Sequence, residues 1–370
     1  HKLEFFISNT SNHFLQKHFN LSLDDDASQI ILWLNEYSSS ICTYEKYRVV
    51  VLRFYLWIKH QKLTLKIINR DHFHAYIEFT KNPDKTWVGK RRRFGDTDWR
   101  PFRNPLTYNA IKQNIQIIRQ LFAYLHNTCY LDFNYSKRHF NIPSSPYNPL
   151  TFDHYLTRQE LNLIGNFIGN LRDNTHSRYF FKIRSRWIFQ VMLFTGCRRS
   201  EISNATMDDF ILIKNKLWLR VNGKGSKYGI VPIPTHLELR LNSYRAIYRL
   251  PRIRERTQPE YHIPLVIKSH SEQRYTSVTH GYIWHVVKLI GNGLAEKILD
   301  EALSSRMRRI SPHWLRHTCA TMQINAGIDI RVVQANLRHS SIQTTMLYLH
   351  LNADYRHHET ITKFGQNLVN

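Results

Sequence analysis

The chain has 370 residues, which at roughly 100–200 residues per domain predicts two domains, or three. Lys and Arg number 52 against 28 Asp and Glu, and this formal charge of +24 excludes an ordinary near-neutral enzyme and favours a polyanionic partner, nucleic acid above all. A hydrophobic fraction of 42% with 13% aromatic residues excludes a disordered basic tail. Because the apolar runs are too short for a membrane span and the four cysteines lack Cys-x-x-Cys spacing, we expect a folded protein of the reducing cytosol, with no membrane partner, disulfide framework or zinc knuckle.

Residues 38–131 show helical periodicity. In the segment 43–61, apolar side chains recur at three- and four-residue steps with basic residues on the other side, at Tyr44, Tyr47, Val51, Phe54, Tyr55 and Ile58. The segment 106–131, with Thr107 as its N-cap, repeats the pattern at Ile111, Ile115, Ile118, Leu121, Phe122 and Leu125. We therefore predict a small all-helical domain over residues 1–150.

A basic loop lies between these two helices. Residues 81–103 hold eight Lys or Arg against three Asp, and their Gly and Pro content predicts a loop. Cations interleaved with Trp87 and Trp99 suit phosphate contacts and insertion into a DNA groove, although a solvated loop that only adds solubility is the alternative. The candidate DNA-binding residues are Lys90, Arg91, Arg92, Arg93, Arg100 and Arg103.

A second domain follows a linker rich in proline. Pro143, Pro146 and Pro149 interrupt any helix and predict a domain boundary near residue 150. Beyond it, Thr157 and Glu160 have the spacing of a capping box, an apolar helix over 184–195 precedes a glycine, and residues 216–223 and 228–234 form a predicted β-hairpin. The pattern returns to helix from residue 251 to the end of the chain. We predict a mostly helical domain over 151–370 with a small antiparallel sheet and a C-terminal tail.

Two turns of this second domain carry cations that suit phosphate chemistry. Arg198 lies at a turn between two helices, and Glu201 is placed to hold that turn or the arginine itself. Taken alone, Arg198 is better explained as a cap on helix carbonyls. Lys224 lies between two glycines at the turn of the hairpin, where the backbone can approach a ligand closely, and Lys227 is a second candidate in the same turn. A lysine in a turn is usually only solvated.

The C-terminal part adds two histidines, an arginine and a tyrosine. His313 and Arg316 are three residues apart and share a helix face, whereas His317 points about 100° away and is interpreted as packed or solvent-exposed. His339 lies just before a turn into another helix. Tyr348, among apolar neighbours, would by itself be interpreted as a half-buried core residue.

Together and in this order, these positions resemble the tyrosine recombinase family, also called phage integrases. The family motifs Thr-Gly-Leu-Arg, Gly-Lys-Gly, His-x-x-Arg, Leu-Gly-His and Thr-Thr-x-x-Tyr correspond to residues 195–198, 223–225, 313–316, 337–339 and 344–348. The resemblance implies a catalytic set, with Glu201 in support, of Arg198, Lys224, His313, Arg316, His339 and Tyr348.

Three positions depart from the family pattern. Cys197 replaces a Leu, Gly229 stands where the hairpin usually has an Arg, and Arg338 stands where the family usually has Gly. None of these departures removes a side chain with an assigned chemical role. We expect Arg338 to affect how closely the turn that bears His339 approaches a phosphate.

The resemblance also implies a fold and a mechanism. The helical domain would be a core-binding (SAM-like) domain that forms a clamp around DNA with a mixed α/β catalytic domain. The two arginines would bind the scissile phosphate, Tyr348 would attack it and His313 would accept the tyrosine proton. His339 would hydrogen-bond the phosphate, and Lys224 would protonate the leaving oxygen. The motifs hold no cluster of Asp and Glu at metal-ligand spacing, and there is no phosphate-binding Gly-rich loop followed by Lys-Ser or Lys-Thr, so we expect no metal and no other cofactor.

The implied partner is a double-stranded DNA recombination site, with a dimer on each site and a homotetramer on synapsed DNA. Ile361, Phe364 and Leu368 recur at helical steps in the tail, which would dock on a neighbouring protomer or fold back on its own core. An accessory DNA-bending or directionality factor is compatible with the resemblance, as is a location on the bacterial nucleoid.

We expect site-specific integration or excision of a mobile element, because the basic loop looks like that of integrases carried on such elements. The alternatives are resolution of chromosome or plasmid dimers, DNA relaxation of the type IB topoisomerase kind, and a DNA-binding protein without catalysis.

Overall fold

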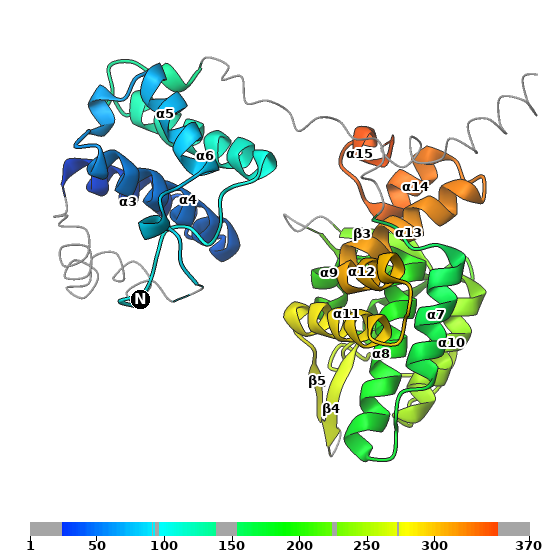
Figure 1. Cartoon of the computed structure of the whole chain (residues 1–370). Helices are drawn as coiled ribbons and strands as arrows, with labels where there is room; N and C mark the ends of the chain where they lie inside the picture. Colours follow the sequence, from blue (N-terminus) through cyan, green and yellow to red (C-terminus); the bar gives the residue numbers. More distant parts are fainter. Residues whose placement is uncertain are drawn as a thin grey trace, which may run out of the picture. The chain divides into compact units, whose positions relative to one another are not determined.

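The computed structural model describes residues 24–90, 92, 96–137, 154–223, 228–271 and 274–346. It divides the chain into two compact units, residues 1–147 and 148–370, called here unit 1 and unit 2 (Figure 1). Each unit has its own hydrophobic core. The proline-rich segment predicted as a linker lies outside the described residues. No described helix has the length and apolar character that crossing a membrane requires.

The regular secondary structure in the described part of unit 1 is helical, apart from an isolated β-bridge between Val88 and Phe102. Its α-helices are α3 (Asp25–Asn35), α4 (Ile41–His60), α5 (Arg70–Lys81) and α6 (Tyr108–Asn127), joined by 3-10 helices at Leu65–Ile67, Lys85–Trp87 and Tyr135–Lys137. Thr107 caps α6 by accepting a hydrogen bond from the backbone N–H of Ala110 at 3.4 Å. The apolar stripe predicted for α6 is buried along its whole length. The helical character expected of this part of the chain is therefore confirmed.

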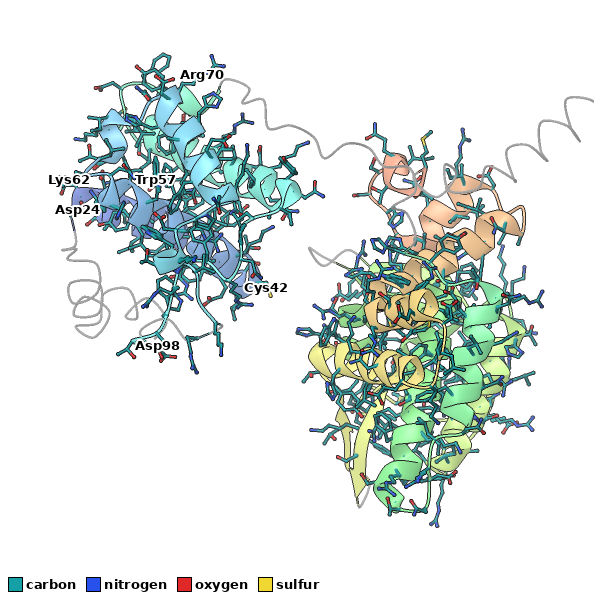
Figure 2. The ribbon with its side chains drawn as sticks, viewed as in Figure 1. Asp24, Cys42, Trp57, Lys62, Arg70 and Asp98 are labelled. Atoms are coloured by element: carbon teal, nitrogen blue, oxygen red, sulfur yellow. The ribbon has the colours of Figure 1, made fainter. Side chains whose placement is uncertain are left out.

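Helix α4 is the central helix of unit 1, and its burial differs from the predicted stripe. Tyr44 and Tyr47 of the stripe are only partly buried, whereas Leu56 and Trp57 outside the stripe are buried, because α3 and α6 both pack against this helix. The rings of Phe54, Phe73 of α5 and Phe122 of α6 form one cluster, in which Phe54 is 6.0 Å from each of the other two and these are 5.0 Å apart. Figure 2 shows Trp57 within the helices and Asp98, from the basic loop, at the periphery.

The basic loop is closed at its base by buried aromatic rings. The backbone N–H of Phe102 donates to the carbonyl oxygen of Trp87 at 3.0 Å, and the N–H of Gly89 donates to that of Phe102 at 2.9 Å. Trp87 is only 7% exposed and packs on Phe79 with ring centroids 5.1 Å apart. The expectation that Trp87 inserts into a DNA groove is therefore wrong, because its indole belongs to the core and anchors the loop.

Unit 2 is a larger, mixed α/β unit. Its α-helices are α7 (Arg158–Gly169), α8 (His176–Thr195), α9 (Arg199–Asn204), α10 (Thr235–Ile247), α11 (His280–Ala295), α12 (Glu301–Arg309), α13 (Pro312–Asn325), α14 (Ile330–Leu337) and α15 (Ile342–Met346). Two short 3-10 helices lie at Met207–Asp209 and Ile253–Glu255. Helix α8 packs against α7, α10, α11 and α13. The predicted capping box is confirmed, because Thr157 and Glu160 each accept a hydrogen bond from the other's backbone N–H, at 3.2 and 2.7 Å.

Two small antiparallel sheets complete unit 2. Strands β1 (Phe210–Ile213), β2 (Lys216–Asn222) and β3 (Tyr228–Pro232) pair in the order β1-β2-β3, so the predicted hairpin has an additional strand. Strands β4 (Ile267–Ser271) and β5 (Arg274–Ser277) form a second sheet. Figure 1 places this pair at one end of unit 2 and α14 and α15 at the other.

The β4-β5 pair corrects the expectation of helix from residue 251 onward. These strands are only four and five residues long, too short for an alternating pattern to stand out from their surroundings. The pair depends on tertiary contacts as well. Arg184 of α8 donates to the carbonyl oxygens of Ile267 and Lys268, at 2.8 and 2.5 Å, and so holds strand β4 against the helix.

Candidate active site and DNA interface

The first arginine turn is built around a glycine. Gly196 ends α8 with φ +59°, in the left-handed region, and a Cβ there would lie 2.5 Å from Cδ2 of Leu337 and 3.2 Å from Sγ of Cys319. Any side chain at this position would therefore separate α8 from α13 and α14. The tight turn places Arg198 at the N-cap of α9, with its side chain 43% exposed.

Glu201 holds Arg198 by two contacts. One carboxylate oxygen accepts the backbone N–H of Arg198 at 2.7 Å, and the other accepts Nη1 of the Arg198 guanidinium at 2.9 Å. The Glu201 side chain is only 3% exposed. Burial raises the pKa of this carboxyl group, but the charge of Arg338 and the hydrogen bonds from Arg198 outweigh burial and lower it below its usual range. Glu201 is therefore ionised, and it fixes both the turn and the arginine.

Arg316 joins two chain segments that the sequence separates widely. It lies on α13 and is 5% exposed. Its Nη1 donates to the carbonyl oxygen of Gly196 at 2.5 Å, and its Nη2 donates to that of Leu337. A planar guanidinium with two carbonyl partners has a fixed orientation. Arg316 thus ties the Arg198 turn to the end of α14, two residues before His339.

The positive charges of these arginines act on both predicted histidines. Burial, followed by the charges of Arg199, Arg316 and Arg198, lowers the pKa of His313. Burial, followed by Arg316 and Arg198, lowers the pKa of His339 to about 4. Both imidazoles are therefore neutral near pH 7, and a neutral imidazole can accept a proton or donate a single one. His317, which the sequence left as packed or exposed, is half-buried, and burial lowers its pKa to about 4 as well.

His339 is oriented by its surroundings. Its Nδ1 lies 2.9 Å from the hydroxyl oxygen of Thr345, which is fully buried in α15. If that hydroxyl donates, the imidazole proton resides on Nε2. Helix α15 ends at Met346, and Tyr348 lies outside the described residues, as does Lys224 in the hairpin turn. The structure therefore brings together four of the six predicted catalytic residues and describes neither of the other two.

Unit 1 presents a basic groove of about 530 Å³ between the loop 81–103 and helices α4 and α6. Among the predicted DNA-binding residues, Lys90, Arg92, Arg100 and Arg103 line this groove, and all four are exposed. Arg91 and Arg93 lie outside the described residues. No carboxylate is among the described lining residues. The charged residues described in the lining of this groove are therefore all cationic.

Helix α4 adds two arginines to this groove that are not among the predicted DNA-binding residues. Arg48 and Arg53 line it, and Arg53 lies 4.4 Å from the centre of the Phe102 ring while its Nε donates to the carbonyl oxygen of Pro101 at 3.1 Å. Burial lowers the pKa of Arg53, and the nearby charge of Arg103 acts in the same direction. In the sequence, Arg48 and Arg53 could be recognised only by their place on the basic side of α4. The fold is needed to show which loop that side of the helix contacts.

A comparison with known protein families decides the classification. The family model described as "Phage integrase family" matches residues 155–354, more than half of the chain. The chain belongs to the phage integrase family. As expected from its motifs, it is a member of the tyrosine recombinases, a family of enzymes that cleave and rejoin DNA.

Several recombinases resemble this phage integrase family member in sequence. Tyrosine recombinase XerD of Pasteurella multocida is 27% identical over 332 residues, which are 88% of this chain and 94% of that protein. Tyrosine recombinase XerD of Lacticaseibacillus casei is 34% identical over 170 residues, 46% of this chain and 51% of that protein. The chain thus spans nearly all of one relative and about half the length of the other.

Solved structures share the fold of this tyrosine recombinase. XerH site-specific recombinase, bound to its palindromic difH substrate after cleavage, has a TM-score of 0.61 with 17% identity over 95% of this chain and 94% of that one. A lambda integrase dimer bound to a core site has a TM-score of 0.55 with 11% identity, over 87% and 94% of the two chains. At these identities the likeness establishes the mainly helical fold with its small sheets.

Proposed function

We propose that this chain is a site-specific DNA recombinase with Tyr348 as its nucleophile. The observation that carries the proposal is the cluster in unit 2, where two fixed arginines and two neutral histidines converge at the start of the segment that leads to Tyr348. A phosphodiester under attack gains negative charge on its nonbridging oxygens, and pre-oriented cations stabilise that charge.

The steps balance with protein side chains alone. The Tyr348 oxygen forms a bond to phosphorus, and its proton passes to His313, whose lowered pKa keeps it neutral and able to accept. The bond from phosphorus to the 5′ oxygen breaks, and Lys224 gives a proton to the leaving oxygen, which becomes a free 5′-hydroxyl. The 3′-phosphotyrosine conserves the energy of the phosphodiester. A free 5′-hydroxyl of another strand then reverses the step, and successive exchanges pass through a Holliday junction.

A nicked suicide substrate tests the nucleophile. We expect the wild type to trap a covalent adduct, Tyr348→Phe to trap none, and Tyr261→Phe, at a tyrosine that is 73% exposed, to behave as the wild type. Adduct formation should persist in EDTA. A wild type that forms no adduct, or an adduct that survives Tyr348→Phe, would contradict the assignment.

For the biological role, we propose integration or excision of a mobile element. The role rests on the likeness of the basic loop to that of integrases carried on such elements. Four cations of this loop line one groove in unit 1, which supports contact with DNA. Resolution of chromosome or plasmid dimers and relaxation of supercoiled DNA are the alternatives. Recombination between two unlike sites supports integration or excision. A requirement for two identical sites supports dimer resolution, and relaxation of DNA without any site supports the topoisomerase alternative.

The proposed assembly is a dimer on each site and a tetramer on two synapsed sites. The C-terminal tail, which lies outside the described residues, would dock on a neighbouring protomer. Deleting residues 360–370 should leave binding to a single site intact while weakening synapsis and recombination. Unchanged recombination after this deletion would contradict docking between protomers.

A further inference from the structure

The three departures from the family motifs lie around a single side chain. Arg338 ends α14 with φ +55° and ψ +45°, a left-handed conformation that normally favours glycine. Its Nη2 reaches Glu201 at 2.6 Å and lies 3.6 Å from Sγ of Cys197, while its Nη1 donates to the carbonyl oxygen of Asn336 at 2.8 Å. The side chain is 13% exposed. Arg338 is therefore a partly buried, well-anchored cation at a position with an unfavourable backbone.

Gly229 leaves the space that this side chain occupies. A Cβ at residue 229 would lie 2.5 Å from Cδ of Arg338 and 3.1 Å from its Cγ. Strand β3, which carries Gly229, packs against α14. Even an alanine at 229 would therefore push the Arg338 side chain out of its present path. The glycine in the strand and the arginine in the turn are sterically compatible as a pair.

We propose that Arg338 is a positioning residue for Arg198 and acts through the carboxylate that the two arginines share. One oxygen of Glu201 accepts both the backbone N–H of Arg198 and Nη2 of Arg338, while the other oxygen holds the Arg198 guanidinium. The inference rests on the proposed function, because it concerns the orientation of an arginine assigned to the scissile phosphate.

The same contact joins two parts of the cluster. Arg338 directly precedes His339, so its ion pair with Glu201 links the turn that carries His339 to the turn that carries Arg198. Arg316 makes the parallel connection with neutral partners, from the carbonyl of Gly196 to that of Leu337. Loss of Arg338 leaves the hydrogen bonds from Arg316 to the two carbonyl oxygens in place and removes the ion pair with Glu201. The carboxylate of Glu201 then has fewer fixed partners and holds Arg198 less firmly.

Charge and geometry agree on this role. Among the influences that lower the pKa of Glu201 against the opposing effect of burial, the charge of Arg338 comes before the hydrogen bonds from Arg198. Arg338 thus helps to keep the buried carboxylate ionised as well as oriented. An ionised Glu201 can accept from both arginines at once, whereas a protonated carboxyl group has less acceptor capacity.

The first experiment measures single-turnover cleavage of a suicide substrate at saturating DNA, together with DNA affinity. We expect Arg338→Gln to cleave at least about tenfold more slowly than the wild type, with a DNA affinity within about threefold of the wild-type value. Arg338→Lys keeps the charge, and its cleavage rate should lie within about threefold of the wild-type rate. The matched control is Arg249→Gln, because Arg249 is exposed and also has a left-handed backbone, with φ +57°. Wild-type cleavage by Arg338→Gln, or equal losses in the Gln and Lys variants, would overturn the proposal.

A second pair of variants tests the steric coupling and does not depend on the Gln variant folding. Gly229→Ala alone should slow cleavage because its Cβ displaces the arginine, and it should add no further loss in an Arg338→Gly background. Equal effects of Gly229→Ala in both backgrounds would contradict the coupling. If the wild type forms no adduct, the proposed function fails. If a Tyr348-dependent adduct forms and the Arg338 variants cleave normally, only this inference fails.

Discussion

The exposed loop arginines of the unit 1 groove and the arginines of the unit 2 cluster are held in different ways. In the basic groove of unit 1, Arg92 and Arg103 are exposed at the surface of a loop. In unit 2, Arg316 is 5% exposed with two carbonyl partners, and Arg198 shares a buried carboxylate with Arg338. Solvated cations attract a polyanion over a long surface, whereas tethered cations are oriented before a ligand arrives. The difference suggests that one group provides affinity and the other provides catalysis.

The largest expected effect is on the cleavage rate, when Arg198 is removed from the arginine cluster of unit 2. Arg198→Ala should lower single-turnover cleavage by roughly 10²–10³-fold, the usual loss when one pre-oriented donor to a transition state is removed. DNA affinity should stay within about threefold, because most of the positive surface is elsewhere. Arg240→Ala, at an exposed arginine of α10, is the control and should match the wild type. A large loss of affinity with normal cleavage at saturation would reverse the assigned roles.

Arg316→Ala sharpens the comparison within unit 2. It removes the donor from two buried carbonyls, those of Gly196 and Leu337, and each unsatisfied group costs roughly 1–3 kcal/mol. We expect the free energy of unfolding to fall by about 3 kcal/mol, against less than about 1 kcal/mol for the more exposed Arg198. Chemical denaturation followed by circular dichroism measures both variants. Equal destabilisation by Arg316→Ala and Arg198→Ala would contradict the role of Arg316 in joining the two chain segments.

A pH titration of stability probes the field of the same arginines. The pKa of His339 is about 4 in the folded protein against 6.5 for an unperturbed histidine. Between these values the unfolded chain binds more protons, so stability is full above about pH 6.5 and declines as the pH falls toward 4. His339→Gln should remove part of this decline, about 2 kcal/mol after allowance for solvent screening. The exposed His262 supplies the control, His262→Gln, and superimposable profiles for wild type and His339→Gln would refute the assignment.

The smallest expected effect is in the groove. Arg92→Gln combined with Arg103→Gln should weaken DNA binding about tenfold and reduce the slope of log affinity against log salt by about two, since each phosphate contact contributes about 0.9. Lys62→Gln, at an exposed lysine elsewhere in unit 1, should change neither quantity. Binding isotherms at several salt concentrations measure both, and an unchanged slope would show that the groove does not hold phosphates.

Local patterns in the sequence were sufficient to predict much of the fold. The stripe of α6 with its Thr107 cap, the capping box of α7 and the glycine that ends α8 each depend on residues a few positions apart. The β4-β5 pair was missed because it depends on Arg184, more than eighty residues earlier in the chain. Trp87 was misassigned for a similar reason, since the sequence alone does not show whether a loop aromatic faces solvent or the core.

In the candidate site too, contacts between residues far apart in the sequence could not be predicted. Spacing and family motifs identified the residues with assigned chemistry, and they marked Cys197, Gly229 and Arg338 only as separate departures. These three positions span 141 residues in the chain and meet around one guanidinium in the fold. A contact of this kind leaves no local pattern, because its partners come from three different elements. Only the fold shows that the arginine and the glycine are compatible.

The most direct test of the division between the two arginine groups is the cleavage rate measured as a function of DNA concentration. The groove variant Arg92→Gln/Arg103→Gln should need more DNA but reach the wild-type rate at saturation, whereas Arg198→Ala should bind normally and remain slow at every concentration. A groove variant that stays slow at saturation, or an Arg198→Ala enzyme that added DNA restores, would contradict the account.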